Sequence, residues 1–473
     1  MAGFHVENFG CRAARADGEA VSARLRADGL SEQPLAQADV VVLNTCSVTA
    51  EADRDARAFL RRTRRLNPAA RVVVTGCYAQ RAPEELAALA GVSAVVGNSH
   101  KGLLPEIVRD LALNTPTPTA PPQYITPAQL TGPVPVWAND GFAHSAIEEA
   151  QVLPGAQTRP NLKIQEGCSN RCTFCIIPTT RGNSRSLPTE KVLAQVHGFL
   201  AAGGHELVFS GINLGRWGRD LPPANGIQPT LASLVRDILT QTTLPRLRLS
   251  SIEPMDWTPD LIQLLADFAP SARLARHVHL PLQSGSDAVL RRMHRRYRPW
   301  HYAAKVAQLS AAAGPGLALG ADVMVGFPGE TDAEFAETHA FIQQLPFTYL
   351  HLFPFSPRPG TPGWQLHQAS PVPAAVVRRR MHALESLAAQ KSHAFRATFL
   401  GRTLPAITLN TRPAHAAEGL GSALTDNFLP VELTHPAPAN QLIRVAITAI
   451  TPTGVLQGSS IETPPLPLAL PQD

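Results

Sequence analysis

The stretch EGCSNRCTFCIIP (Glu166–Pro178) places three cysteines, Cys168, Cys172 and Cys175, at the spacing C-x3-C-x2-C. It follows the run LKIQ (Leu162–Gln165), which we interpret as a strand. Thiolates at this spacing can converge on one iron–sulfur cube and leave its fourth iron without a protein ligand, open to bind and reduce a substrate. The alternatives are buried thiols or a zinc site, but structural zinc sites usually close with four ligands, and no local His or Cys completes this set.

The remaining three of the six cysteines, Cys11, Cys46 and Cys77, are far apart in the sequence. Each nevertheless comes just after a run that predicts a strand: HVEN, VVLN and VVVT. Parallel strands bring their carboxyl ends to one edge of a sheet, so the three thiols can meet there and hold a second cluster with an open iron. Inert buried cysteine is the default for widely spaced residues, but the shared placement argues against it.

The rest of the chain predicts an α/β protein of several domains. Residues 1–113 alternate short β-branched runs with helical patterns, which is typical of a small parallel sheet covered by helices. Residues 114–160 begin as a linker rich in Pro and Thr, because proline at that density blocks helices and central strands. Six strand–helix units in residues 161–400 predict a βα barrel, one that can be partial.

After Gly401 the pattern changes to short strands separated by Gly, Asn and Pro, which predicts a small all-β module over residues 401–462. The end of the chain, PPLPLALPQD, is expected to be a disordered tail.

The formal charge of +5 is compatible with an RNA partner without establishing one. Arg61–Arg65, Arg378–Arg380 and His294–Arg298 are candidate phosphate contacts, with solvated helix faces as the alternative. The sequence shows no apolar run of bilayer length and no secretory signal pattern, which favours a cytoplasmic protein without a membrane partner.

Together these motifs resemble the radical S-adenosylmethionine (SAM) methylthiotransferase family, and the similarity covers nearly the whole chain. Besides EGCSNRCTFCIIP, the stretches that carry it are NTCSVT, GCYAQ, SSIEP, LPLQSGSD and DVMVGFPGET. The resemblance implies an N-terminal domain with an auxiliary cluster, a central radical SAM partial barrel and a C-terminal TRAM-like RNA-binding barrel, the last supported by Gly419–Leu433. The spacing at Cys11 and the stretch CIIPTTRGNSRS favour the MtaB-type branch, which methylthiolates N6-threonylcarbamoyladenosine beside the tRNA anticodon.

The resemblance also implies the cofactors and their sites: two [4Fe-4S] clusters, one on each cysteine triad, and S-adenosyl-L-methionine. It implies tRNA as a partner and an electron donor such as flavodoxin or ferredoxin, and it leaves the sulfur donor unknown. The residues expected to contact SAM are Phe174, Gly203, Gly204, Glu206, Glu253, Gln283, Ser284 and Asp322. Each has an ordinary structural role as its alternative. Arg181 and Arg185, after the cysteine loop, can stabilise substrate charge or form ordinary salt bridges.

Three other functions stay open at this point. Two belong to the same family: a methylthiotransferase for isopentenyladenosine in tRNA, or one for a ribosomal protein. The third is a non-catalytic iron–sulfur RNA-binding protein, which would need a fourth cysteine in each cluster. The chain departs from the family pattern at Ala14, where an Asn usually follows the first cysteine by three residues, and this puts support for the auxiliary site in doubt.

Overall fold

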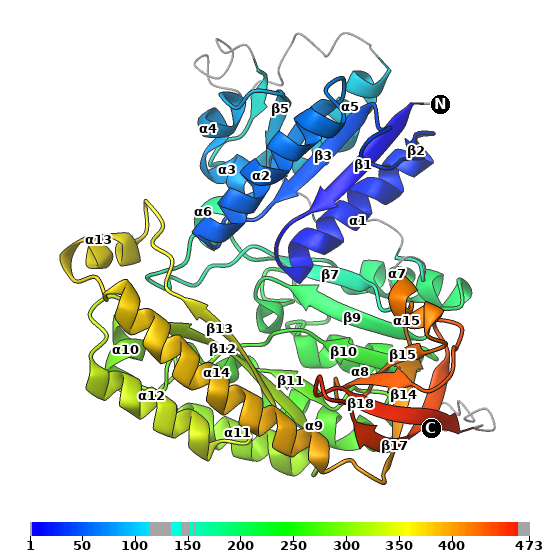
Figure 1. The fold of residues 1–473 in the computed structure, drawn as a ribbon, viewed down its shortest axis with the longest axis vertical. Coiled ribbons are helices and arrows are strands. Elements are labelled where there is room, and N and C mark those ends of the chain that lie inside the picture. Colours follow the sequence, from blue (N-terminus) through cyan, green and yellow to red (C-terminus); the bar gives the residue numbers. More distant parts are fainter. Residues whose placement is uncertain (1, 114–133, 143–146, 148–151, 155–157, 462–473) are drawn as a thin grey trace. The chain divides into compact units, whose positions relative to one another are not determined.

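The computed structural model describes residues 2–113, 134–142, 147, 152–154 and 158–461 (Figure 1). The predicted linker and tail lie mostly outside these ranges. Contacts divide the chain into two compact units. The first holds residues 1–151, 165–186 and 356–364, and the second holds residues 152–164, 187–355 and 365–473. Both cysteine triads therefore belong to the first unit, although the predicted domain boundary at residue 161 would have separated them.

The first unit is built on a six-stranded sheet with the order β2-β1-β3-β4-β5-β6, and all its strand pairs are parallel. The predicted strands and helices over residues 3–76 are confirmed. β5 and β6 were not predicted. The strands are β1 (Gly3–Asn8), β2 (Ser31–Glu32), β3 (Val40–Thr45), β4 (Arg71–Gly76), β5 (Val92–Gly97) and β6 (Val136–Trp137). The helices between them are α1 (Arg12–Ala27), α2 (Ala50–Leu66), α3 (Cys77–Arg81), α4 (Pro83–Ala87), η1 (Asn98–Leu103) and α5 (Leu104–Ala112).

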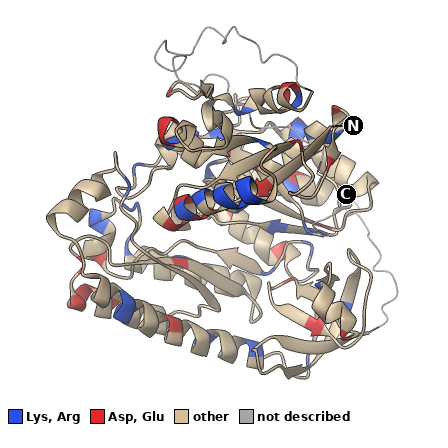
Figure 2. Ribbon diagram, turned by 45° about the horizontal axis from the view of Figure 1, so that its top comes forward, with Lys and Arg blue, Asp and Glu red and all other residues tan. Residues whose placement is uncertain are grey.

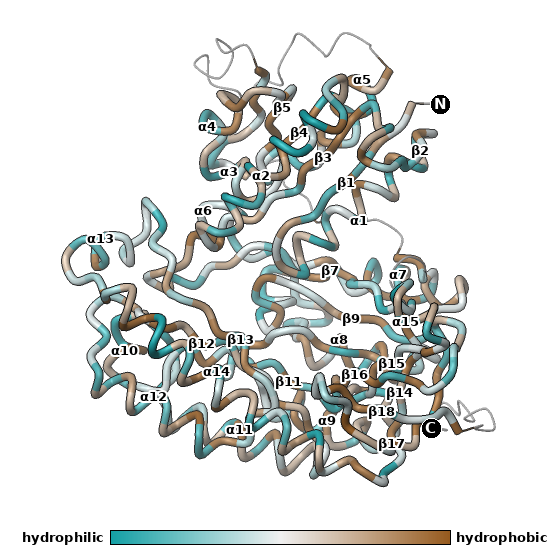
Figure 3. Tube along the Cα trace, in the orientation of Figure 1, coloured by the Kyte–Doolittle hydropathy of each residue, from teal (hydrophilic) through white to brown (hydrophobic). Residues whose placement is uncertain are grey.

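The sheet is covered on both faces because its central strands are apolar on both. All six residues of β3 are buried. Val41 and Leu43 pack in one core beside Phe59 of α2, whereas Val40 and Val42 pack in the other with residues of α1 and α5. The strands stand out as the hydrophobic parts of this unit (Figure 3). Such continuous apolar runs are typical of parallel strands covered by helices on both sides.

Two segments distant in the sequence join this unit. One holds the end of β7 (Asn161–Glu166), the cysteine loop, α6 (Ile177–Arg181) and β8 (Arg185–Ser186). The other, residues 356–364, is held by Arg358, whose Nη1 donates to Asp53 Oδ2 at 2.7 Å and whose Nε donates to the Val48 carbonyl at 3.3 Å. Asp53 is buried and also accepts from Arg81 at 3.0 Å.

The second unit contains the predicted partial barrel. Within this unit, β10, β9 and residues 161–164 of β7 pair in that order, and β11, β12 and β13 form another sheet. The isolated parallel bridge Ser251–His279 links the two sheets. The barrel strands after β7 are β9 (Glu206–Gly211), β10 (Arg246–Leu249), β11 (His277–His279), β12 (Ala318–Val325) and β13 (Tyr349–Pro354). The helices are α7 (Thr189–Ala201), η3 (Leu214–Arg216), α8 (Leu231–Gln241), η4 (Pro254–Asp256), α9 (Pro259–Phe268), α10 (Asp287–Arg292), α11 (Pro299–Ala313), α12 (Asp332–Gln344), α13 (Pro362–Ala369) and α14 (Ala374–Ala397).

The predicted all-β module is a closed barrel of order β14-β15-β16-β18-β17 around its own apolar core. Its strands are β14 (Thr403–Thr408), β15 (Gly421–Thr425), β16 (Pro430–Leu433), β17 (Leu442–Ile450) and β18 (Leu456–Ile461), with the short helix α15 (Pro413–Ala417) after β14. No helix among the described residues has both the length and the apolar character that crossing a membrane requires.

The turn between β15 and β16 fastens this small barrel to the partial barrel within the same unit. Arg248 of β10 is fully buried and donates to the carbonyls of Thr425 at 3.1 Å and Asp426 at 3.0 Å. The buried carboxylate of Asp426 accepts from Arg276 at 2.6 Å. The Phe428 ring lies 4.3 Å from the ring of His277. Buried charges thus hold the C-terminal barrel in place.

Arg248→Met tests this attachment. Removing one partner of a buried ion pair typically costs about 3–5 kcal/mol, because the remaining charge loses its partner. We expect the C-terminal barrel to become susceptible to limited proteolysis and the thermal midpoint to fall. The matched control is Arg444→Met, which removes an exposed arginine on β17. Equal protease resistance of the two variants would contradict this role of Arg248.

Candidate functional site

The first cysteine triad lies at one edge of the N-terminal sheet. In the register of the strands, Asn8 of β1 pairs with Asn44 of β3, which pairs with Thr75 of β4. Cys11, Cys46 and Cys77 follow these three residues by three, two and two positions. The structure therefore brings the three carboxyl ends together, as the sequence predicted.

Two glycines allow the chain to pass close to these thiols. Gly10 has a φ of +117°, and a Cβ at this position would lie 2.5 Å from the Cβ of Cys46. Gly76 has a φ of +96°, and a Cβ there would lie 2.3 Å from the Thr45 carbonyl oxygen. Only glycine adopts this geometry without strain or collision. Both positions thus maintain the close approach of the three strand ends.

The thiols of this triad are close enough to influence one another. Burial raises the pKa of Cys46, and the thiolates of Cys77 and Cys11 raise it further, to about 12. Cys46 and Cys77 are buried, whereas Cys11 at the start of α1 is exposed. Burial and mutual repulsion both disfavour the charged thiolates, so a bound cation would be needed for all three sulfurs to be negative. The arrangement fits a bound metal cluster.

The second triad lies on the loop between β7 and α6. The Cys168 N–H donates to the Gly182 carbonyl at 3.0 Å, and the Cys175 N–H donates to the Cys172 carbonyl at 3.1 Å. The Asn170 N–H points at Cys168 Sγ, 3.4 Å away. Cys168 is buried and the other two cysteines are half-buried, as is Phe174 between them. The loop is thus folded around its thiols, and one thiol already accepts a backbone hydrogen bond.

Arg181 ties the second loop to the first triad. Its side chain is 1% exposed, and its Nε donates to Cys77 Sγ at 3.2 Å. Its Nη1 donates to both carboxylate oxygens of Glu166 at 2.9 Å and to Asp17 at 3.2 Å. Burial alone lowers the pKa of an arginine, but Cys77, Glu166 and Asp17 outweigh it and raise the pKa of Arg181. Of the two interpretations left open from the sequence, the salt bridge is the one that the structure shows.

Further residues, none of them predicted, complete this buried network. The Lys101 ammonium pairs with the same oxygen of Asp17. Asn98 donates to the Thr180 carbonyl at 2.8 Å and lies 3.6 Å from Cys77 Sγ through the same amide nitrogen. Asn44 donates to the carbonyl of Ala14 at 2.6 Å. The backbone of Ala14 thus accepts a hydrogen bond beside the first triad, although its side chain cannot.

Three of the residues predicted to hold SAM lie at the amino end of β9. Glu206 is fully buried and pairs with Arg248 at 2.8 Å, Arg246 at 3.2 Å and Arg159 at 3.5 Å. Burial raises the pKa of this carboxyl, but the three guanidinium groups outweigh it and lower the pKa to about 2. Ligand sites of βα barrels form at the opposite, carboxyl ends of the strands, so this placement argues against a contact between Glu206 and SAM.

Gly203 and Gly204 belong to the turn that leads into β9. Gly203 has a φ of +80°, and its carbonyl accepts from Asn440 at 2.8 Å. A Cβ at Gly204 would lie 2.2 Å from the Phe199 ring. The glycine pair thus serves the turn from α7. At its carboxyl end, β9 finishes with Ser210 and Gly211 and leads into Ile212 and Asn213, a stretch that was not predicted to contribute to the site.

The other predicted SAM contacts lie at or near the carboxyl ends of their strands. Glu253 follows β10 and accepts from Arg295 at 2.5 Å. Gln283 follows β11 in the left-handed region, with a φ of +64°, and the Ser284 hydroxyl lies 2.9 Å from that of Thr338. Asp322 lies on β12 beside two histidines. The structure holds all four in place, and their contact with SAM stays a prediction.

The donor chemistry of both triads fits iron–sulfur clusters. Each triad has three cysteines, and the chain has no seventh. N–H groups of Arg181 and Asn170 point at sulfurs, which is how proteins stabilise thiolates that bind iron. Three thiolates leave one iron of a cubane open for another ligand.

Comparisons with known proteins agree with this geometry. Residues 3–97 match the Uncharacterized protein family UPF0004, and residues 162–342 match the Radical SAM superfamily. The chain is 35% identical to the Threonylcarbamoyladenosine tRNA methylthiotransferase MtaB of Bacillus subtilis, over 91% of this chain and 90% of that protein. The chain belongs to the radical SAM methylthiotransferase family. It is therefore an enzyme, and its family uses [4Fe-4S] clusters and SAM.

One further comparison is with a relative in sequence, and another is with a solved structure. It is 31% identical to the tRNA-2-methylthio-N(6)-dimethylallyladenosine synthase of Geobacter metallireducens, over 96% of this chain and 97% of that protein. The fold resembles that of the radical SAM methyltransferase TsrM from Kitasatospora setae, solved with cobalamin and a [4Fe-4S] cluster bound. That likeness has a TM-score of 0.52 at 15% identity and covers 77% of each chain. It supports the fold of this methylthiotransferase and nothing finer.

Arg181→Met tests the network beneath the triads. The variant leaves Asp17 and Glu166 buried with fewer cationic partners, so we expect a loss of about 3–5 kcal/mol of local stability. Hydrogen exchange followed by mass spectrometry is expected to show faster exchange in α1 and α5. Arg171→Met is the control, because it removes an exposed arginine from the same loop. Unchanged protection in the Arg181 variant would show that the network is not structural.

Proposed function

We propose that the chain methylthiolates C-2 of N6-threonylcarbamoyladenosine beside the anticodon of tRNA. The observation that carries this proposal is the pairing of two cysteine triads within one compact unit, each with three thiols. The choice of substrate is supported by the name of the Bacillus subtilis relative, which the chain matches over nearly its full length.

The reaction explains why two clusters are needed. The hydrogen on C-2 of an adenine ring is not acidic enough for a side-chain base, so its removal needs a radical. A cluster on Cys168, Cys172 and Cys175, when bound, supplies the electron that cleaves SAM to methionine and a 5′-deoxyadenosyl radical. A cubane cluster has four irons, so three ligands from Cys168, Cys172 and Cys175 would leave one iron open for SAM. Phe174 lies between Cys172 and Cys175 in the sequence and is half-buried, and in this proposal it contacts SAM.

In this proposal Cys11, Cys46 and Cys77 would hold the second cluster, which would supply the sulfur to be transferred, and a further SAM molecule would supply the methyl group. Arg181 and Asn98 act on Cys77 through N–H···S contacts, which favour the thiolate over the thiol. The same Arg181 also pairs with Glu166, the residue that ends β7 just before the second triad. It therefore acts as a positioning residue for both sets of ligands.

The tRNA would be held by exposed basic residues and by the C-terminal barrel. On α2, Arg61, Arg62, Arg64 and Arg65 are all exposed, while Thr63 between them is buried. Figure 2 shows where Lys and Arg lie along the ribbon, in blue. Their charges can neutralise phosphates without reading sequence. The runs Arg378–Arg380 and His294–Arg298 are weaker candidates for phosphate contacts. In the first, Arg380 is buried and paired with Glu330, and in the second Arg295 is buried and paired with Glu253. An electron donor such as flavodoxin or ferredoxin completes the proposed set of partners.

The second candidate substrate is isopentenyladenosine in tRNA. It is favoured by one observation, the 31% identity to the dimethylallyladenosine synthase of Geobacter metallireducens. The chemistry at C-2 of the ring is the same for both nucleosides, so the two proposals differ in the group on N6. A methylthiolated ribosomal protein remains the alternative outside RNA.

Mass spectrometry of tRNA nucleosides distinguishes these substrates. We expect cells that lack the gene to lose the methylthio form of threonylcarbamoyladenosine and to accumulate its unmodified parent. Reintroducing the gene is expected to restore the product, whereas Cys168→Ala or Cys46→Ala is not. Loss of methylthio-isopentenyladenosine instead would shift the assignment to the second nucleoside. Unchanged tRNA in all samples would contradict a tRNA substrate.

Iron content tests the two ligand sets separately. Replacing Cys168, Cys172 and Cys175 by Ala is expected to leave about four irons per chain, and replacing Cys11, Cys46 and Cys77 is expected to leave the same number. The variant without all six is expected to bind none. SAM should alter the electron paramagnetic resonance spectrum of only the second of the two triple variants. If one triple variant lost all iron, a single cluster shared by both triads would be indicated.

A further inference from the structure

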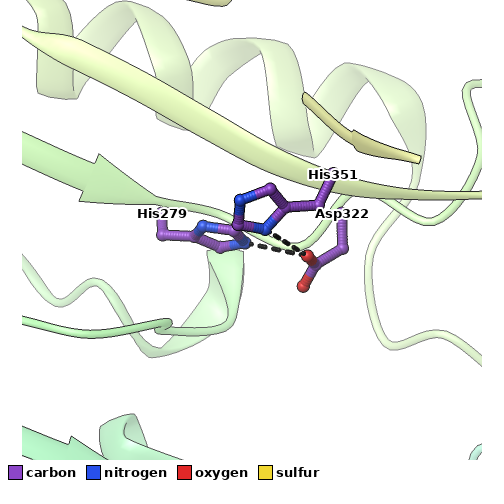
Figure 4. Close-up of side chains that lie close together, drawn as sticks. All are labelled: His279, Asp322 and His351. Carbon is purple, nitrogen blue, oxygen red and sulfur yellow. Dashed lines mark ion pairs between the residues drawn. The ribbon is translucent and has the colours of Figure 1, made fainter. Parts of the chain in front are cut away.

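A cluster of two histidines and a carboxylate lies in the second unit, apart from the cysteines. His279, Asp322 and His351 come from the neighbouring parallel strands β11, β12 and β13, and their side chains converge on one point (Figure 4). The register accounts for this. Asp322 pairs directly with His351, and His279 pairs with Gly320, two residues before Asp322 and thus on the same face of the sheet.

Gly320 has no side chain, and this makes room for Tyr349, whose hydroxyl orients His279. A Cβ at Gly320 would lie 1.9 Å from the ring of Tyr349, so only glycine leaves this ring in place. The Tyr349 hydroxyl lies 3.2 Å from Nδ1 of His279 and 2.7 Å from Nε2 of His277. A hydrogen bond on one ring nitrogen fixes the tautomer and leaves the other nitrogen free to bind a metal.

The distances between the facing atoms match those of a metal site. His279 Nε2 lies 3.2 Å and His351 Nδ1 lies 3.3 Å from Oδ1 of Asp322, and all three atoms fall within 4.8 Å of one another. Ligands that surround zinc tetrahedrally at about 2.0–2.1 Å are separated from each other by about 3.3 Å. An ion at the centre of the three atoms would therefore need little rearrangement of the side chains.

An ordinary hydrogen-bonded cluster accounts less well for His279. Its side chain is 10% exposed, and its Nε2 atom lies 3.2 Å from Oδ1 of Asp322. When Nδ1 of a neutral His279 donates to the Tyr349 hydroxyl, Nε2 presents a lone pair to the carboxylate, and a metal ion between the two atoms would remove that repulsion.

We propose that His279, Asp322 and His351 bind a divalent transition-metal ion of the zinc type. Two imidazoles with one carboxylate select such ions over Mg²⁺ and Ca²⁺, which prefer oxygen ligands throughout. Three protein ligands leave at least one coordination position for water or another oxygen ligand. His351 is 59% exposed, so an ion can enter from its side. The proposal does not depend on the proposed tRNA substrate, and it replaces the expected contact of Asp322 with SAM.

The test uses the cluster-loaded protein, so that the cysteines are occupied by iron before zinc is added. After equilibrium dialysis against zinc, we expect the wild-type chain to retain one zinc that His351→Ala and Asp322→Asn lose. His382→Ala is the matched control, because it removes an exposed histidine from α14 and is expected to retain the zinc. X-ray absorption at the zinc edge is expected to show only nitrogen and oxygen ligands, at about 2.0–2.1 Å.

The ligand atoms decide the outcome even if a variant is poorly folded. A zinc signal with sulfur at about 2.3 Å in the wild-type protein would place the ion on cysteines and overturn the proposal. Equal zinc retention in the wild-type, His351→Ala and Asp322→Asn proteins would also overturn it, as would no retention in the wild-type protein. Unchanged thermal midpoints in the two variants, together with loss of the zinc, would complete the case.

Discussion

The buried guanidinium of Arg181 is the interaction on which the arrangement of the cysteines depends. It is 1% exposed and contacts Cys77, Asp17 and Glu166, which come from three separate parts of the sequence. A charge at this depth is tolerated only when its partners surround it, because the cost of removing it from water is several kcal/mol. The loop of the second triad must therefore fold onto the N-terminal sheet, which explains why residues 165–186 belong to the first unit.

The strand ends provide the second constraint. Three adjacent parallel strands end within one residue of the same level, and each is followed by a cysteine after a short turn. The positive φ angles of Gly10 and Gly76 make these turns sharp enough to bring sulfur to the edge. Ligand sites of parallel sheets arise at this edge because backbone groups there are no longer engaged in the ladder. The fold thus assembles three thiols from residues that are more than thirty positions apart.

The sequence predicted most of the architecture because its signals are local. Apolar strands, helical periodicity and the cysteine spacing each need only a few neighbouring residues to be recognised. The network around Arg181 was not predictable in the same way, since Asp17, Lys101 and Glu166 carry no local signal of being partners. The placement of Gly203, Gly204 and Glu206 at the amino end of β9 was not predictable for a related reason. A glycine pair followed by a carboxylate suits either end of a strand, and only the tertiary structure reveals three arginines around Glu206. His279 and His351 were missed because their proximity depends on strand register.

In the partial barrel, the polar residues at the amino ends of the strands have a different role from those further along the strands. At the amino ends, Glu206 and Arg248 form buried ion pairs that hold the C-terminal barrel, so these positions serve stability. Further along the strands lie His279 and Asp322, and beyond them Gln283 and Ser284, none of which contributes to that attachment. Charged and polar groups in a barrel interior cost free energy unless they are paired or bind something. Those at the amino ends are paired with one another. In the group around Asp322, two histidines face the same carboxylate oxygen, and the three atoms lie as close together as ligands of one bound ion would.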